Sequence, residues 1–143
     1  MPWCAISREL SWTCSAMKTI DRVEFQRGDV IWVCCDPSVG VEPRKTRTCV
    51  VVSNDIANRF AGAITVVPTQ AHTPERAARE YVVDLRKPRS TLEAARVANA
   101  SMIMTYDRTR VVRRAGRVSA EALRALDRAL AVHLGLRAEN LHD

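Results

Sequence analysis

Short runs of β-branched and aromatic residues dominate the hydrophobic pattern of the first half of the chain and predict strands. A turn signal, Arg27-Gly28-Asp29, precedes the first such run at residues 30–35 (VIWVCC), which ends at Asp36-Pro37. The next run, residues 49–53 (CVVVS), follows a polar stretch that contains Gly40 and Pro43. We therefore expect a hairpin of two strands with a long charged loop, a kind of segment that often carries function.

Four further elements are expected before residue 86. Asn54 and Asp55 are favourable helix caps, so a short helical turn should run to Phe60. Residues 62–67 (GAITVV) predict a third strand that stops at Pro68. Residues 71–79 (AHTPERAAR) predict a loop or an irregular helix, and residues 80–85 (EYVVDL) alternate well enough for a fourth strand.

The C-terminal part of the chain predicts two more strands and one clear helix. A basic loop at residues 86–90 precedes residues 95–104 (ARVANASMIM) and 108–113 (RTRVVR), two apolar-rich pieces separated by Tyr106-Asp107. The helix should begin after Ser119 and end before Gly135. Its stripe at helical spacing consists of Leu123, Leu126, Leu130 and Leu134.

This stripe is expected to face the core or a dimer interface. Short, largely antiparallel strands and one amphipathic helix favour a small twisted barrel with the helix packed on one face.

The length and composition fit one globular domain. The chain has 143 residues, of which 47% are hydrophobic and 27% are charged. We assign the domain to residues 25–137, with a tail at 138–143. Residues 1–24 form an N-terminal extension, which is either disordered, an ordered arm or, in part, the product of a start assigned upstream of Met17.

No apolar run is long enough for a membrane span or a signal peptide, so a cytoplasmic protein is expected. The five cysteines are an odd number without C-x-x-C spacing, which predicts reduced thiols rather than a disulfide framework or a zinc site.

The charge of the chain is strongly basic and is carried almost entirely by arginine. There are 22 Lys and Arg residues against 16 Asp and Glu, a net charge of +6, and the lysines are only Lys18, Lys45 and Lys87. This balance favours an anionic partner, nucleic acid ahead of membrane. The planar arginine fork matches phosphate oxygens. Genomic base composition is an equally acceptable explanation of the arginine excess.

Metal and cofactor motifs are not found. His72, His133 and His142 are not at metal-ligand spacing with other ligand types, and the glycine-rich nucleotide loops and G-x-S-x-G are lacking. An enzyme with this sequence would use arginine, hydroxyl and carboxylate groups, with no metal or cofactor. These groups suit RNA cleavage by the 2′-hydroxyl of the RNA itself, which needs positioning, proton transfer and charge stabilisation.

Two segments supply such groups: residues 40–47 (GVEPRKTR) contain three cations and a carboxylate, and Pro68-Thr69-Gln70 adds a hydroxyl and an amide. By composition alone, a solvated loop and a strand terminus are the favoured explanation of these two segments.

Seven fragments in order resemble the MazF/PemK family of toxin endoribonucleases. They are residues 27–32 (RGDVIW), 36–42 (DPSVGVE), 46–47 (TR), 53–60 (SNDIANRF), 68–70 (PTQ), 105–110 (TYDRTR) and 116–119 (GRVS). The resemblance spans about residues 26–136.

The resemblance implies a mainly β fold with helices, an SH3-like barrel of the CcdB/PemK type, and a homodimer. It implies metal-independent cleavage of single-stranded RNA at a short sequence, leaving 2′,3′-cyclic phosphate and 5′-hydroxyl ends. It also implies a cognate antitoxin, similar to MazE or PemI, with an acidic segment that fills the groove.

Roles for individual residues follow from the same resemblance. Arg47 stabilises the charge on the phosphorane and takes part in proton transfer, and the Thr69 hydroxyl holds a phosphate oxygen. Glu42 organises the loop, contacts RNA or acts as a general base. The remaining positions are RNA contacts, to phosphates for Arg44 and Lys45 and to base edges for Asn54 and Gln70.

The chain departs from the family pattern at two places. The family usually has Arg-Pro where this chain has Arg47-Thr48, and a glycine-containing loop where this chain has residues 43–46 (PRKT). We expect a stiffer, more basic loop, which affects sequence recognition more than catalysis.

The arginines of residues 108–117 are either a second RNA track or a solvated or interface face that an acidic antitoxin covers. Two alternative functions stay open: a CcdB-type inhibitor that binds DNA gyrase, and a single-stranded nucleic-acid binding module, although the few aromatic residues make the latter's stacking surface thin.

Overall fold

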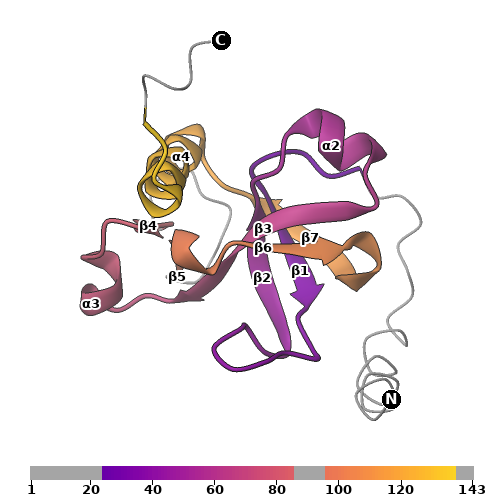
Figure 1. Cartoon of the computed structure of the whole chain (residues 1–143), viewed down its shortest axis with the longest axis horizontal. Helices are drawn as coiled ribbons and strands as arrows, with labels where there is room; N and C mark the ends of the chain where they lie inside the picture. Colours follow the sequence, from indigo (N-terminus) through magenta and orange to yellow (C-terminus); the bar gives the residue numbers. More distant parts are fainter. Residues whose placement is uncertain (1–23, 86–95, 138–143) are drawn as a thin grey trace.

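The computed structural model describes residues 24–85 and 96–137, which form a strongly bent sheet with one long helix against it (Figure 1). The sheet order is β4-β5-β3-β2-β1-β7, and β6 pairs with β3. The basic loop at residues 86–90, the tail at 138–143 and all but the last residue of the expected extension lie outside the described residues.

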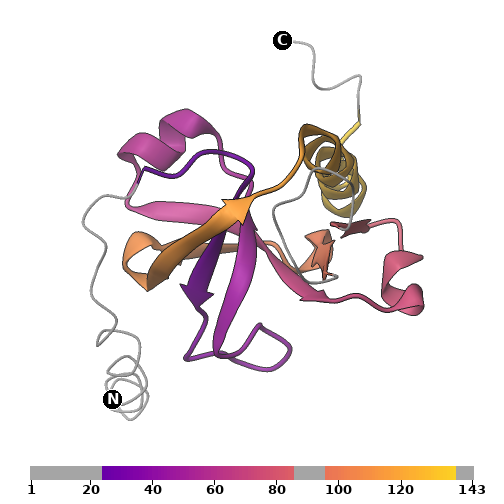
Figure 2. The ribbon, with the colours of Figure 1, turned by 180° about the vertical axis from the view of Figure 1, so that it is seen from behind.

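The first two strands form the expected hairpin. β1 (Asp29–Cys34) and β2 (Thr46–Val51) pair antiparallel, from Val30 opposite Val50 to Cys34 opposite Thr46. The loop between them projects from the foot of the hairpin (Figure 2). On its other edge β1 pairs with β7 (Val111–Arg117). The loop is therefore anchored at both ends by paired strands.

The third strand is the structural centre of the sheet, and it does not stop at Pro68 as expected. β3 (Ala63–Ala71) pairs with β6 (Met104–Asp107) through its first half and with β5 (Arg96–Asn99) through its last three residues. Pro68 lies between these two partners, a place where a missing amide hydrogen is tolerated. β4 (Val82–Asp84) pairs with the far edge of β5.

The segment of residues 95–104 is not one strand, because a 3-10 turn, η1 (Ala100–Met102), separates β5 from β6. The Asn99 side chain causes this break by accepting a hydrogen bond from Ser101 N at 3.0 Å. Tyr106 and Asp107, expected as a connection, belong to β6. A second 3-10 turn, η2 (Arg108–Arg110), then leads into β7.

The helices begin and end largely where their capping residues predict. Asn54 caps α2 (Asp55–Phe60), and Thr73 caps the short α3 (Pro74–Ala77). The long helix α4 (Ala120–Leu134) begins after Ser119, whose hydroxyl accepts from Ala122 N at 3.1 Å. It ends at Gly135, which has the left-handed φ of 67°.

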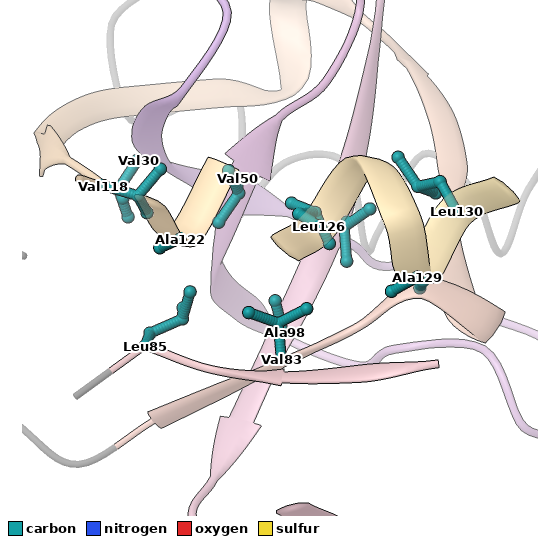
Figure 3. Packing of buried hydrophobic residues seen from close by; sticks show 12 residues of the cluster. Val30, Val50, Val83, Leu85, Ala98, Val118, Ala122, Leu126, Ala129 and Leu130 are labelled. Atoms are coloured by element: carbon teal, nitrogen blue, oxygen red, sulfur yellow. The ribbon is translucent and has the colours of Figure 1, made fainter. Parts of the chain in front are cut away.

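Two hydrophobic clusters hold the sheet together. The inner face of α4 presents Leu126 and Leu130 to one cluster that contains Val50, Val83 and Ala98 (Figure 3). The other cluster contains Ile31, Val51, Ile64 and Val66. Leu134, the last member of the predicted stripe, is 52% exposed, so the stripe enters the core only in part.

Within the described part of the chain, no helix is both long and apolar enough to cross a membrane. Cys35 and Cys49 are free, buried thiols. Cys34 is disulfide-bonded, so the expectation of reduced cysteines is wrong at this position. Sequence spacing failed here because a disulfide depends on distances set by the tertiary fold. A hydrogen bond from Cys49 lowers the pKa of Cys35 to about 7, whereas that bond and burial raise the pKa of Cys49.

Candidate active site

A groove of about 470 Å³ lies between the β1–β2 loop, the second half of β3, the start of β5 and α3. Four arginines and one carboxylate are among the described residues that line it: Arg44, Arg47, Arg76, Arg96 and Glu42. The excess of positive charge makes the groove suited to an anion such as a phosphodiester chain.

Arg47 is the second residue of β2 and is held by the end of the loop. Its Nε donates to the carbonyl oxygen of Arg44 at 2.9 Å. Between them Lys45 has a left-handed φ of 62°, and its carbonyl oxygen accepts from Cys35 N at 2.8 Å. The bond from Nε orients the guanidinium and leaves its terminal nitrogens available to the groove.

Glu42 closes a turn inside the loop. Its Oε2 accepts from Val39 N at 3.0 Å, and its own N–H donates to Val39 O at 3.2 Å. These contacts favour the loop-organising role among those considered for Glu42. Glu42 also lines the groove.

Thr69 lies on β3 at the wall of the groove and is only 1% exposed. Its Oγ1 is 2.5 Å from Thr48 Oγ1 and 3.1 Å from the Thr48 carbonyl oxygen. It also accepts from Arg96 Nε at 3.0 Å. The hydroxyl therefore has a fixed position with three polar contacts.

Arg96 is a groove residue that the sequence did not identify. It begins β5, and its Nη2 donates to the Thr69 carbonyl oxygen at 3.1 Å. Burial and the nearby positive charge of Arg47 lower the pKa of Arg96 below its ordinary value. Arg47 and Arg96 line the same groove.

Arg76 is the second groove arginine that the sequence did not identify. It extends from α3, and its Nη1 donates to Ala71 O at 2.8 Å. Its position against Ala71 follows from the short α3. The capping residue Thr73 was a local signal for this turn, but it gave no indication of the groove. The signal for Arg96 would have been the register of β5 against β3, in which Arg96 lies opposite Ala71.

The structure brings five of the seven predicted site residues together and places two elsewhere. The five groove residues are Glu42, Arg44, Arg47, Thr69 and Gln70. Lys45 is exposed in the loop but does not line the groove. Asn54 lines a separate hollow of about 580 Å³ beside Asp127 and Leu130, where its side chain caps α2.

The arginines of residues 108–117 have partners within the fold. Arg108 lies 5.2 Å over the Phe25 ring, and Arg113 lies 5.4 Å over the Trp32 ring. The other contacts go from Arg110 to Asp36 O at 2.7 Å, and from Arg114 and Arg117 to the buried carboxylate of Asp29 at 3.1 and 3.5 Å. These contacts favour a structural role for this stretch over a second RNA track.

The described residues contain no group of three or more histidine, cysteine, aspartate or glutamate side chains arranged to hold a metal ion. The side chains of the groove that can take part in acid–base or electrostatic chemistry include arginines, the Thr69 hydroxyl and the Glu42 carboxylate.

Comparison with known proteins gives one family and a consistent fold. Residues 26–134 match the family model described as PemK-like, MazF-like toxin of type II toxin-antitoxin system. The chain is 38% identical to endoribonuclease MazF9 of Mycobacterium tuberculosis over 117 residues, covering 78% of this chain and 98% of that protein. It is 30% identical to endoribonuclease EndoA of Bacillus subtilis over 111 residues, covering 78% and 95%.

Solved structures show the same architecture. MazF from Deinococcus radiodurans aligns with a TM-score of 0.69 at 21% identity, covering 80% of this chain and all of that one. A mycobacterial endoribonuclease in complex with its cognate antitoxin aligns with a TM-score of 0.64 at 24% identity, covering 79% and 97%. Together with the seven-stranded antiparallel sheet, these alignments confirm the predicted barrel-like fold with a C-terminal helix.

Proposed function

Because the chain belongs to the PemK-like, MazF-like family of toxins of type II toxin–antitoxin systems, we propose that it is an endoribonuclease that cleaves single-stranded RNA at a short sequence. Two relatives named as endoribonucleases, at 38% and 30% identity, support the activity. The observation that carries the proposal is the meeting of Arg47 and Thr69, from different strands, in one arginine-lined groove.

The proposed reaction uses the 2′-oxygen of the RNA as nucleophile and needs no metal. This oxygen attacks the adjacent phosphorus as its proton is removed, and the 5′-oxygen of the next nucleotide leaves and takes up a proton. The products are a 2′,3′-cyclic phosphate and a 5′-hydroxyl. Negative charge grows on the non-bridging oxygens in the transition state, where fixed positive groups are most effective.

The groove residues divide these tasks. The guanidinium of Arg47, oriented by its bond to Arg44 O, stabilises the phosphorane charge and takes part in proton transfer. The Thr69 hydroxyl holds a phosphate oxygen. Glu42 organises the loop and is the candidate general base. Flanking contacts are assigned to Arg44 and Lys45 on phosphates and to Gln70 on a base edge.

The partners in this proposal are a second copy of the chain and an antitoxin. An acidic antitoxin segment suits the groove, because it would place carboxylates against the same arginines that bind phosphates. A mycobacterial endoribonuclease of this fold is known in complex with its cognate antitoxin. Cleavage of cellular single-stranded RNA places the activity in the cytoplasm.

The proposal is tested by incubating the purified chain with an unstructured RNA in EDTA, beside Arg47→Ala and Thr69→Ala variants. We expect discrete cuts that survive chelation and are lost in the Arg47 variant. The 5′ ends should accept phosphate directly from polynucleotide kinase, because they carry hydroxyls. Intact RNA, with the wild-type chain folded and several sequences tried, would reject the nuclease and direct the work to DNA gyrase inhibition and to RNA binding without cleavage.

A further inference from the structure

The side chain beside Thr69 on the neighbouring strand is a second buried threonine. Cys49 on β2 lies opposite Pro68 on β3, so Thr48 faces Thr69 one step further along the same register. Thr48 is 7% exposed, and the two hydroxyl oxygens are 2.5 Å apart. The chain therefore has an additional hydroxyl in direct contact with the proposed phosphate-binding group.

Arg96 contacts Thr69 from the opposite strand, β5. Its Nε donates to Thr69 Oγ1 at 3.0 Å and its Nη2 to Thr69 O at 3.1 Å. These bonds use two of the five N–H groups of a guanidinium. A lysine at this position would keep the charge but, with a single nitrogen at its tip, would lose the paired geometry.

A threonine hydroxyl has one hydrogen and two lone pairs. If Thr48 Oγ1 and Arg96 Nε both donate to Thr69 Oγ1, both lone pairs are occupied. The Thr69 hydroxyl can then act only as a hydrogen-bond donor. Without substrate it donates to the carbonyl oxygen of Thr48, 3.1 Å from Oγ1. A phosphate oxygen at the groove wall carries charge and is a stronger acceptor than that carbonyl oxygen.

We propose that Thr48 and Arg96 are positioning residues that fix the Thr69 hydroxyl as a hydrogen-bond donor to the substrate phosphate. The inference rests on the proposed ribonuclease function and goes beyond it by assigning two residues that act on the RNA through Thr69. Arg47, Thr69 and Arg96 all line the same groove, which supports this placement. Burial and the positive charge of Arg47 lower the pKa of Arg96.

The test is a double-mutant cycle on the rate of RNA cleavage under single-turnover conditions. Arg96→Lys and Thr48→Val are each measured alone and combined with Thr69→Val. We expect Arg96→Lys to lower the rate about tenfold and Thr48→Val about threefold when Thr69 is present, and each to have less than about a twofold effect in the Thr69→Val background. Affinity for a non-cleavable 2′-O-methyl RNA should change less than the rate in Arg96→Lys, since the charge is kept.

Matched controls come from the same molecule. Thr65 and Thr105 form another cross-strand pair, with hydroxyl oxygens 2.9 Å apart on an exposed face, so Thr105→Val should leave the rate unchanged. Arg113→Lys makes the same chemical change as Arg96→Lys, at a position stacked on Trp32 outside the groove.

Losses of equal size in both backgrounds would overturn the inference, because they would show that Thr48 and Arg96 act independently of Thr69. If cleavage by Thr69→Val is too slow to follow, the same cycle is measured as the affinity of each variant for the 2′-O-methyl RNA. Additive effects on that affinity would likewise overturn the inference. A folded wild-type chain that leaves every RNA intact would instead overturn the proposed function, and this inference with it.

Discussion

The guanidinium Nε of Arg47 donates to the carbonyl oxygen of Arg44 at 2.9 Å, so the end of the β1–β2 loop orients the Arg47 side chain at the start of β2. Lys45, whose backbone has a left-handed φ of 62°, lies between the two bonded residues in the sequence. The loop and the first residues of β2 therefore form one structural unit, in which the shape of the loop determines where the cation of Arg47 lies.

This relationship predicts that charge alone will not replace Arg47. In Arg47→Lys the ammonium group either contacts Arg44 O or faces the groove, because it has one nitrogen where arginine has three. We expect a loss of cleavage rate of about a hundredfold, the size seen when a single charge-stabilising donor is removed. The measurement is the single-turnover rate, and near wild-type cleavage by Arg47→Lys would contradict the prediction.

A second prediction separates the structural and chemical roles of Glu42. In Glu42→Gln the side-chain oxygen can still accept from Val39 N, but the group no longer takes up a proton at neutral pH. If Glu42 only organises the loop, the glutamine variant keeps its rate within about threefold and Glu42→Ala loses more. If Glu42 is the general base, both variants lose about a hundredfold or more.

Arg44 should contribute to RNA affinity through charge rather than sequence recognition. A single-stranded RNA that loses one phosphate contact shows a salt dependence shallower by about 0.7 in the slope of log affinity against log salt. We expect this change for Arg44→Gln, with the cut site unchanged. Arg113→Gln is the control, and an equal change in its slope would instead support a second RNA track on β7.

The buried carboxylate of Asp29 should stabilise the fold. It accepts from Gln26 N at 2.9 Å and pairs with Arg114 and Arg117 at the junction of β1 and β7. Asp29→Asn removes the charge from these bonds and should lower the free energy of unfolding by about 1.5–3 kcal/mol. Urea unfolding measures this, with the exposed Glu80→Gln as a control expected within about 0.5 kcal/mol of wild type.

The end of α4 offers a prediction with an internal control. Gly135 has a left-handed φ of 67° and nothing within 4 Å of an added Cβ, so Gly135→Ala tests backbone strain without a steric clash. We expect a loss of about 1–2 kcal/mol in unfolding free energy. Gly62 also has open space around it but no left-handed φ, so Gly62→Ala should be neutral or stabilising by up to about 1 kcal/mol.

The local elements of this fold could be predicted from sequence because their signals are local. The β-branched runs identified β1 and β2, and the capping residues Asn54, Ser119 and Gly135 fixed helix ends. Pro68 misled the prediction, because whether a proline ends a strand depends on which neighbour the strand has at that point. The apolar segment around Asn99 contains a turn that its hydrophobic pattern did not reveal. The Asn99 side chain caps η1 through a hydrogen bond to the local backbone, and this bond competes with the backbone hydrogen bonds of a continuing strand.

The candidate site was predictable only where residues of the resemblance came together. Arg47, Glu42 and Thr69 are in short matching fragments and meet in the groove. Arg96 and Arg76 were missed because their contacts with Thr69 and Ala71 depend on the pairing of β3 with β5 and on the position of α3. The RNA contact assigned to Asn54 stays a prediction: its side chain caps α2 and lines a hollow other than the groove.

The pairing of β1 with β7 determines how much of the chain must be synthesised before the groove can form. Asp29 pairs with Arg117, so β1, the strand that precedes the groove loop, gains its second neighbour only after most of the chain has been translated. The groove also needs Arg96, which follows Thr69 by 27 residues. Contacts so distant in sequence slow folding, because the chain between the two partners must first be closed into a loop. A chain translated only as far as β3 therefore lacks part of the groove, so the proposed RNA cleavage also requires the strands that follow β3.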